Sequence, residues 1–218
     1  LHYSVEGDEN EDSYDSSHDD VKEAITFASK KNILDFTVFK PTAIASSILL
    51  EKISKGIELS NEEKILYDKV LTRFDNICKL AAEKNIKILI DAEESWIQDA
   101  IDDLALKMMI RYNKTSAIVY NTSQMYRHDR LDYLKKLHKI AKEKKFFIGI
   151  KLVRGAYIEK ENTRAKKLNY KSPICSSKKE TDINFDNGAK YILSNLERFS
   201  LFCGTHNENS IYSIINLM

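Results

Sequence analysis

The sequence predicts an α/β protein whose strands and helices form an incomplete, TIM-like (β/α)8 barrel of about six β/α units. Short apolar runs alternate with longer segments of helical periodicity, a pattern typical of parallel strands joined by crossover helices. No GxGxxG turn follows any run, which disfavours a dinucleotide-binding doubly wound sheet. Nearly every apolar run ends in a charged or reactive side chain, as in barrels, where the chemistry lies at the carboxyl ends of the strands.

Six apolar runs, each followed by a stretch of helical periodicity, are predicted as strands. They are Leu1–Val5, Leu34–Phe39, Ile86–Ile90, Ala117–Tyr120, Phe146–Val153 and Phe199–Cys203. The side chains at or just after their ends are the candidates for function. These are Lys40, Asp91, Asn121, Lys151 with Arg154, and Thr205 with His206.

Helices are predicted where apolar side chains repeat at helical spacing. The segment between the second and third runs is too long for one crossover helix, so we expect two helices with a break at Gly56. A turn at Tyr170–Pro173 separates two more helical stretches. The predicted helices with the clearest pattern are Val21–Lys31, Ala43–Lys55, Asn61–Lys84, Trp96–Tyr112 and Arg130–Lys144.

Local signals mark two helix starts and one loop. Ser60 with Glu63, and Ser95 with Gln98, have the spacing of capping boxes. The acidic segment from 8 to 20 is expected to be a solvated connection between a strand and the next helix.

Composition indicates a globular protein, with 43% hydrophobic and 31% charged residues. The 34 Lys and Arg against 33 Asp and Glu leave a net charge of +1, which gives no strong field for a nucleic-acid partner. Three cysteines, odd in number and far apart, predict no disulfide framework and favour a reducing, cytoplasmic compartment. No apolar run approaches the roughly 18 residues of a membrane span.

The length of 218 residues fits one domain, 1–218, but falls short of the barrel that the pattern predicts. A complete (β/α)8 barrel usually needs about 250 residues, so roughly two units would be missing. The chain starts inside an apolar run and lacks an initiator Met. We therefore expect it to be cut at both ends.

Three strand-end side chains are candidates for catalysis on pattern alone. Lys151 follows Phe147 and Gly149 at period two, and Gly149 would leave a gap where something flat could lie. Lys40 stands at the end of its strand, and Asp91 could pair with an inward lysine, which would lower its pKa. Structural ion pairs at such positions are the alternative for each residue alone.

The histidines and cysteines offer little further chemistry. His206, just after the last strand, is the histidine best placed for function, whereas His138 is expected on a helix surface and Cys203 in the core. No HxH or HExxH spacing occurs, so no metal site is expected. The nearest set of metal-ligating side chains is Asp91, Glu93, Glu94 and His206.

Six short motifs accompany the predicted strand ends. They are YSVEG at 3–7, FKPT at 39–42, LIDAEESW at 89–96, YNTSQMYR at 120–127, KLVRGAY at 151–157 and GTHNE at 204–208. Taken in this order they resemble the proline dehydrogenase family, closest to its monofunctional, FAD-dependent form. The resemblance implies a distorted (β/α)8 barrel that holds FAD at the carboxyl ends of its strands. It also implies oxidation of L-proline to Δ1-pyrroline-5-carboxylate, the first step of proline catabolism.

The resemblance also implies roles for individual residues. Lys151, Lys40 and Asp91 would be catalytic, with hydride passing from the proline C5 to the flavin N5. Substrate would contact Lys40, Asp91, Leu152 and Tyr157. FAD would contact Gln124, Lys151, Val153, Gly155, Lys178, Thr205, His206 and Asn207. A cation beside the ring would stabilise the charge that the flavin gains.

One departure from the family pattern concerns the substrate carboxylate. The family ends with a YLxRRxxEN helix whose arginines clamp that carboxylate, and no such stretch occurs between 1 and 218. An inactive barrel fragment is therefore one alternative for this chain, and a barrel lyase that forms a Schiff base on Lys40 or Lys151 is another. The resemblance further implies a quinone as electron acceptor and a peripheral location at the inner membrane, or alternatively in mitochondria.

Overall fold

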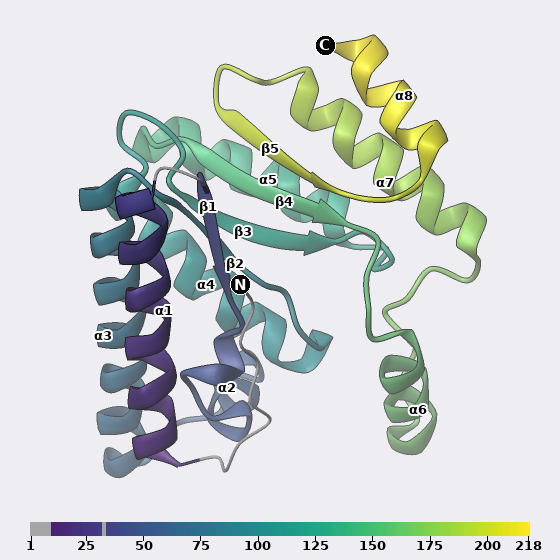
Figure 1. The fold of residues 1–218 in the computed structure, drawn as a ribbon. Helices are drawn as coiled ribbons and strands as arrows, with labels where there is room; N and C mark the ends of the chain where they lie inside the picture. The colour runs from purple at the N-terminus through teal and green to yellow at the C-terminus, as the bar shows by residue number, and fades with distance from the viewer. Residues whose placement is uncertain (1–9, 32–33) are drawn as a thin grey trace. The chain divides into compact units, whose positions relative to one another are not determined.

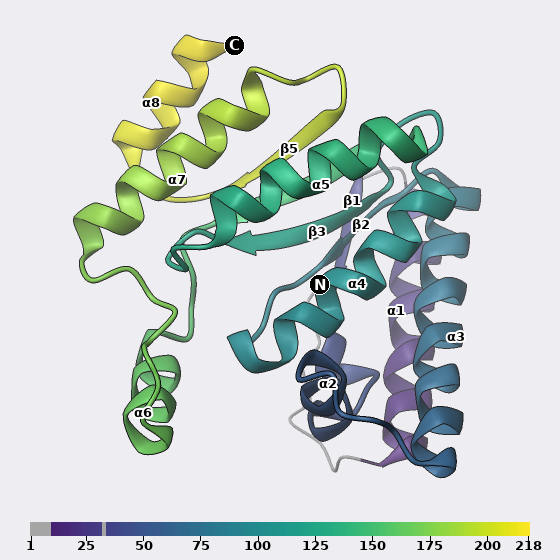
Figure 2. The same cartoon turned by 180° about the vertical axis from the view of Figure 1, so that it is seen from behind.

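The computed structural model describes residues 10–31 and 34–218, which separate into two compact units, Leu1–Asn121 and Thr122–Met218 (Figures 1 and 2). The strand predicted at Leu1–Val5 lies outside the described residues. Parallel strands alternate with helices through the rest of the chain, so the predicted α/β class is confirmed.

In the first unit, a parallel ladder joins three strands in chain order, with Phe36 opposite Lys87 and Ile88 opposite Val119. The longest helix, α3, packs beside α1 (Figure 1). The strands are β1 (Phe36–Phe39), β2 (Lys87–Ile90) and the start of β3 (Val119–Gln124). The helices are α1 (Glu11–Lys31), the 3-10 turn η1 (Pro41–Ala43), α2 (Ser47–Ser54), α3 (Asn61–Lys84) and α4 (Ser95–Tyr112).

The second unit begins inside β3, and its strands β4 and β5 run parallel with Lys151 opposite Phe202. Helices α5 and α7 lie on the same side of these strands (Figure 2). The strands are β4 (Ile148–Val153) and β5 (Phe199–Gly204). The helices are α5 (Arg130–Lys144), α6 (Ile158–Leu168), α7 (Lys178–Leu193) and α8 (Glu208–Leu217).

Helix boundaries were predicted best where a local signal fixes them. Helix α3 starts after a complete capping box, in which Ser60 Oγ accepts from Glu63 N and the Glu63 carboxylate accepts from Ser60 N. The predicted range of α5 is also confirmed. The apolar stripe of α4 is fully buried, as its periodicity indicates. Its members are Ile97, Ile101, Leu104 and Met108.

The expected acidic loop from 8 to 20 is wrong, because α1 already begins at Glu11. The segment contains a buried face that its many acidic residues obscure, with Tyr14 and His18 one helical turn apart and Ile25 further along. Two of the acidic side chains, Glu11 and Asp15, lie on this helix and pair with an arginine in α3.

The predicted capping box at Ser95 and Gln98 is also wrong. Glu94 is the N-cap of α4, and Ser95 is its first helical residue. The Gln98 side chain instead accepts from Glu93 N at 3.0 Å, two residues before the Ser95 N that the predicted capping box requires. Polar side chains likewise concealed the end of β3, which continues through a buried run to Gln124.

Two side chains were assigned to the wrong environment. His138 is buried, with Nδ1 2.9 Å from the Tyr191 hydroxyl and its ring edge-on to Phe199. Its face of α5 packs on Tyr191 and Phe199, which are distant in sequence. The neighbouring lysines gave no indication of this packing. Cys203 is exposed, because β5 is the last strand in the order observed among the described residues.

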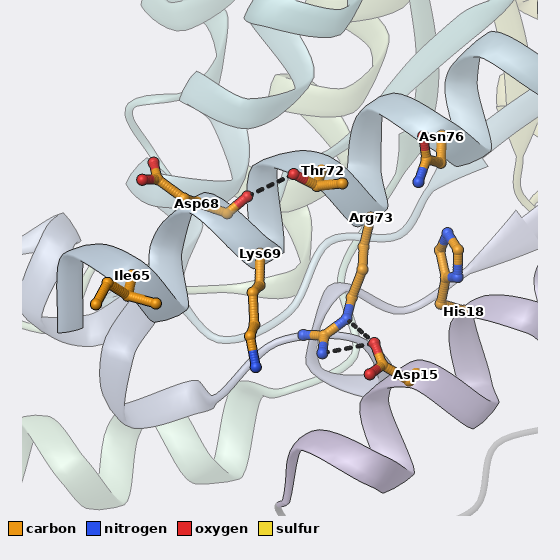
Figure 3. Close-up of a pocket in the computed structure, with 8 residues that line it drawn as sticks. All are labelled: Asp15, His18, Ile65, Asp68, Lys69, Thr72, Arg73 and Asn76. Carbon is orange, nitrogen blue, oxygen red and sulfur yellow. Dashed lines mark hydrogen bonds and ion pairs between the residues drawn. The ribbon is translucent and has the colours of Figure 1, made fainter. Parts of the chain in front are cut away.

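A buried arginine joins α3 to α1 and to the chain after η1. Arg73, 4% exposed, donates from Nε to Asp15 Oδ1 and from NH2 to Glu11 Oε2, each at 2.8 Å. Its NH1 donates to Ile44 O at 3.2 Å. Figure 3 shows Arg73 and Asp15 meeting in a groove of about 440 Å³ between α1 and α3. The ion pairs compensate the charge that this packing buries.

Replacing Arg73 with Met should lower the free energy of unfolding by about 2–3 kcal/mol, because Ile44 O and two carboxylates lose a charged donor. Urea unfolding measures the loss. Arg111→Met is the matched control, since Arg111 is 64% exposed and its pair with Asp75 should contribute less than about 1 kcal/mol. Equal losses in the two variants would contradict the structural importance of Arg73.

Candidate active site

The parallel pairing of β1 and β2 brings two predicted site residues to the same edge of the first unit. Phe39 and Ile90 are register partners, and Asp91 N donates to Phe39 O at 3.0 Å. Lys40 and Asp91 therefore follow neighbouring strands at their carboxyl ends, and both side chains are half-buried. A cation and a carboxylate at this edge can bind the two charged ends of an amino-acid substrate.

Glu93 ties together the two loops that carry these residues. Its carboxylate is buried and accepts from Thr42 N at 2.8 Å and from Thr42 Oγ1 at 2.6 Å. Burial raises the pKa of Glu93, against the opposing effects of the Thr42 hydrogen bonds and the Lys40 charge. From sequence, Glu93 was considered only as a metal ligand, and its positioning role was missed. The signal that could have indicated this role is a second carboxylate, Glu93, between Asp91 and the start of a helix.

A buried amide–carboxylate chain extends this link through α4. Gln98 accepts from Glu93 N and donates from Nε2 to Asp102 Oδ1 at 2.9 Å. Asn121 donates to the same Asp102 oxygen at 2.8 Å. The loop after β2 is thus held through α4 to the strand β3, which limits the freedom of Asp91.

In the second unit, Lys151 lies half-buried on β4, and Val153 of the same strand packs closely against Gly204 of β5. A Cβ added at Gly204 would lie 2.8 Å from Val153 Cγ1 and 3.8 Å from Lys151 Cε. Any larger residue at this position would fill the space beside Val153 and Lys151. Leu152, by contrast, is fully buried, and the alternation of β4 places it on the face opposite Lys151.

Gln124 and the turn after β4 fix each other. Gln124 is buried, and its Oε1 accepts from Ala156 N at 3.0 Å, which orients the amide group. Gly155 has φ +137°, and a Cβ there would lie 2.5 Å from the Tyr126 ring, so only glycine fits. Tyr157 follows, half-buried, at the N-cap of α6.

Arg154 organises the remaining predicted cofactor residues. It donates to Asp182 Oδ1 and Thr205 Oγ1, each at 2.6 Å, and to Ser210 Oγ at 2.9 Å. Lys178 also pairs with Asp182, at 2.7 Å, and the two cations, Lys178 first, hold the pKa of Asp182 below its usual range. Sequence reasoning placed Arg154 at a strand end but gave it no role.

The last predicted cofactor residues follow β5. Asn207 caps α8, its side chain accepting from Ser210 N at 3.1 Å, and the His206 side chain is exposed. In the part of the chain that the structure describes, no three His, Cys, Asp or Glu side chains are grouped to hold a metal ion.

Glu93→Gln should change how stability depends on pH. The raised pKa means that the contribution of Glu93 is most favourable below about pH 4 and is lost as the pH rises through the raised value. The unfolding free energy of the wild type, relative to Glu93→Gln, should therefore fall as the pH rises above about 4. Chemical denaturation at several pH values measures this, with Glu62→Gln, at an exposed position, as control. A constant difference would refute it.

Comparison with known proteins places this geometry in context. The family model described as proline dehydrogenase matches residues 1–218. The carbapenem antibiotics biosynthesis protein CarD of Pectobacterium carotovorum is 32% identical over 99% of this chain and 56% of its own length. The mitochondrial proline dehydrogenase 1 of Homo sapiens is 30% identical over 70% of this chain and 26% of its own length.

A solved structure shows the same fold at lower identity. Proline utilization A (PutA) from Bdellovibrio bacteriovorus, inactivated by N-propargylglycine, superposes with a TM-score of 0.83 and 19% identity. The match covers 97% of this chain and 23% of that chain. The predicted incomplete barrel is thereby confirmed as the fold class. The chain spans about half the length of CarD and about a quarter of the other two proteins.

Proposed function

This chain belongs to the proline dehydrogenase family, and on that basis we propose that it is the FAD-binding barrel, residues 1–218, of an enzyme that oxidises L-proline to Δ1-pyrroline-5-carboxylate. The observation that carries the proposal is the gathering of cationic and hydrogen-bonding side chains at the carboxyl ends of parallel strands. In the first unit these are Lys40 and Asp91, and in the second they are Gln124, Lys151 and Thr205. The family relationship favours flavin chemistry over a Schiff-base lyase.

The residues present fit FAD. A flavin presents nitrogen and oxygen acceptors along its ring edge, and Lys151, Gln124 and Thr205 are donors of the required kind. Gly204 places no side chain beside Lys151 and Val153, where a Cβ would meet Val153 Cγ1 at 2.8 Å. When bound, FAD supplies the hydride acceptor for the oxidation.

Lys151 supplies a fixed positive charge at the end of β4. In the proposal it stabilises the negative charge that the ring gains, as preorganised cations do. Val153 and Gly155 border the same space, and His206 and Asn207 line the cofactor from the loop before α8. Lys178, paired with Asp182, approaches the phosphates.

Substrate recognition is assigned to Lys40 and Asp91, with Lys40 binding the proline carboxylate. Tyr157 forms a wall for the pyrrolidine ring. Leu152, predicted as the second wall, has no exposed surface and lies on the β4 face opposite Lys151. Glu93 keeps Lys40 in place through Thr42.

A quinone is the proposed electron acceptor, reached at a membrane surface. Among the helices in 10–31 and 34–218, none has the length and apolar character of a membrane span. A peripheral place at a bacterial inner membrane, facing the cytoplasm, fits this acceptor, and relatives from animals and plants are named as mitochondrial.

Lys151→Met should lower kcat about 100-fold because the cation beside the ring is lost. The assay is reduction of a dye acceptor by L-proline in the full-length enzyme, with FAD content measured from its visible absorption. Lys167→Met, an exposed lysine on α6, should leave kcat unchanged. Full activity of Lys151→Met, or a wild-type enzyme that binds no FAD, would overturn the proposal. Borohydride trapping of a lysine adduct would instead favour the lyase.

A further inference from the structure

The Arg154 guanidinium is held on three edges and one face. Besides donating to Asp182, Thr205 and Ser210, it lies 4.4 Å from the centroid of the Phe185 ring. These contacts connect the end of β4 to α7 and to the segment around the start of α8. A side chain fixed in this way holds its charge in one position.

Ser210, one of the three partners of Arg154, donates its hydroxyl hydrogen within the protein. It accepts from Arg154 NH2 and donates to Asp186 Oδ1 at 2.6 Å, and the residue is buried. Ser210 is therefore a structural member of the network, closed to any ligand.

Thr205 differs from Ser210, because its hydroxyl oxygen accepts two hydrogen bonds and its hydroxyl hydrogen is donated to no described residue. Its Oγ1 accepts from Arg154 NH1 at 2.6 Å and from Asn207 N at 3.1 Å. A hydroxyl has two lone pairs and one hydrogen, and neither donor can reverse its role. Among the described residues nothing accepts the Thr205 hydrogen, and the side chain is half-buried. The hydrogen is therefore available to an acceptor from outside the protein.

We propose that Arg154 is a positioning residue that makes Thr205 an obligatory hydrogen-bond donor, so that the FAD atom it meets is an acceptor. The inference rests on the proposed FAD site and specifies the chemistry of one contact in it. The charge of Arg154 also polarises the hydroxyl, which strengthens its donation. The acceptor is an oxygen of the diphosphate, or an oxygen or nitrogen of the flavin and ribityl part.

The affinity for FAD, followed by quenching of flavin fluorescence in the full-length protein, tests the contact. Thr205→Val should raise the Kd about tenfold, and Thr205→Ser should stay within about twofold of wild type. Arg154→Gln should weaken binding similarly, and the double variant Arg154→Gln with Thr205→Val should be no weaker than the weaker single variant. Independent, additive losses, or no loss in Thr205→Val, would overturn the inference.

Two further variants guard against unfolding and general charge effects. Arg198→Gln removes a half-buried arginine that contacts the Phe147 ring in the same unit, and it should leave the Kd unchanged. If Arg154→Gln does not fold, Arg154→Lys can replace it. The lysine retains the positive charge but makes fewer hydrogen bonds, so part of the affinity for FAD should be lost. A wild-type Kd in Arg154→Lys, together with additive behaviour with Thr205→Val, would contradict the positioning role.

Riboflavin distinguishes the two sources of the acceptor. If Thr205→Val weakens FAD but not riboflavin, the acceptor is on the diphosphate. If it weakens both, the acceptor is on the flavin and ribityl part. Either result supports donation by Thr205.

Hydrogen exchange of the ligand-free protein separates this inference from the proposed function. The Asn207 amide donates to Thr205 Oγ1, so its exchange should accelerate in Thr205→Val and also in Arg154→Gln. A wild-type protein without affinity for FAD would defeat the proposed function. The exchange result would still decide whether Arg154 positions Thr205. Unchanged exchange in Arg154→Gln would overturn it.

Discussion

The in-register hydrogen bonding of parallel strands is the constraint on which the candidate site depends. Parallel neighbours end at the same edge, so a residue that follows one strand lies beside a residue that follows the next. Asp91 is brought next to the end of β1 by a backbone bond to Phe39, and Gly204 is brought against Val153 by the β4–β5 ladder. The backbone thus determines which side chains meet before any side-chain contact forms.

Buried polar networks then hold those strand ends in one conformation. Glu93 in the first unit and Arg154 in the second each connect loops that are far apart in sequence. Arg154 has three hydrogen-bond partners, and the Glu93 carboxylate accepts two hydrogen bonds from Thr42 that offset part of the cost of its burial. The side chains of the candidate site are therefore supported by hydrogen-bonded residues in neighbouring loops, as preorganised sites require.

Sequence patterns could predict most strand ends, except that of β3, and the start of α3, because periodicity and capping act over a few residues. They could not predict the roles of Glu93, Arg154 or His138, whose partners lie more than 25 residues away. The start of α1 was missed for the same reason, since the acidic residues of its first turns pair with Arg73 in α3. Charge alone does not distinguish a solvated side chain from one paired in the tertiary structure.

The fit of Gly155 against Tyr126 has a consequence for evolution and for redesign. Since the glycine combines a left-handed φ with contact to the aromatic ring, a change at 155 meets two penalties together. A smaller residue at 126 would relieve only the clash, so even paired substitutions remain strained. Variation in this loop should be confined to neighbouring positions such as Tyr157, which can change without rebuilding the turn.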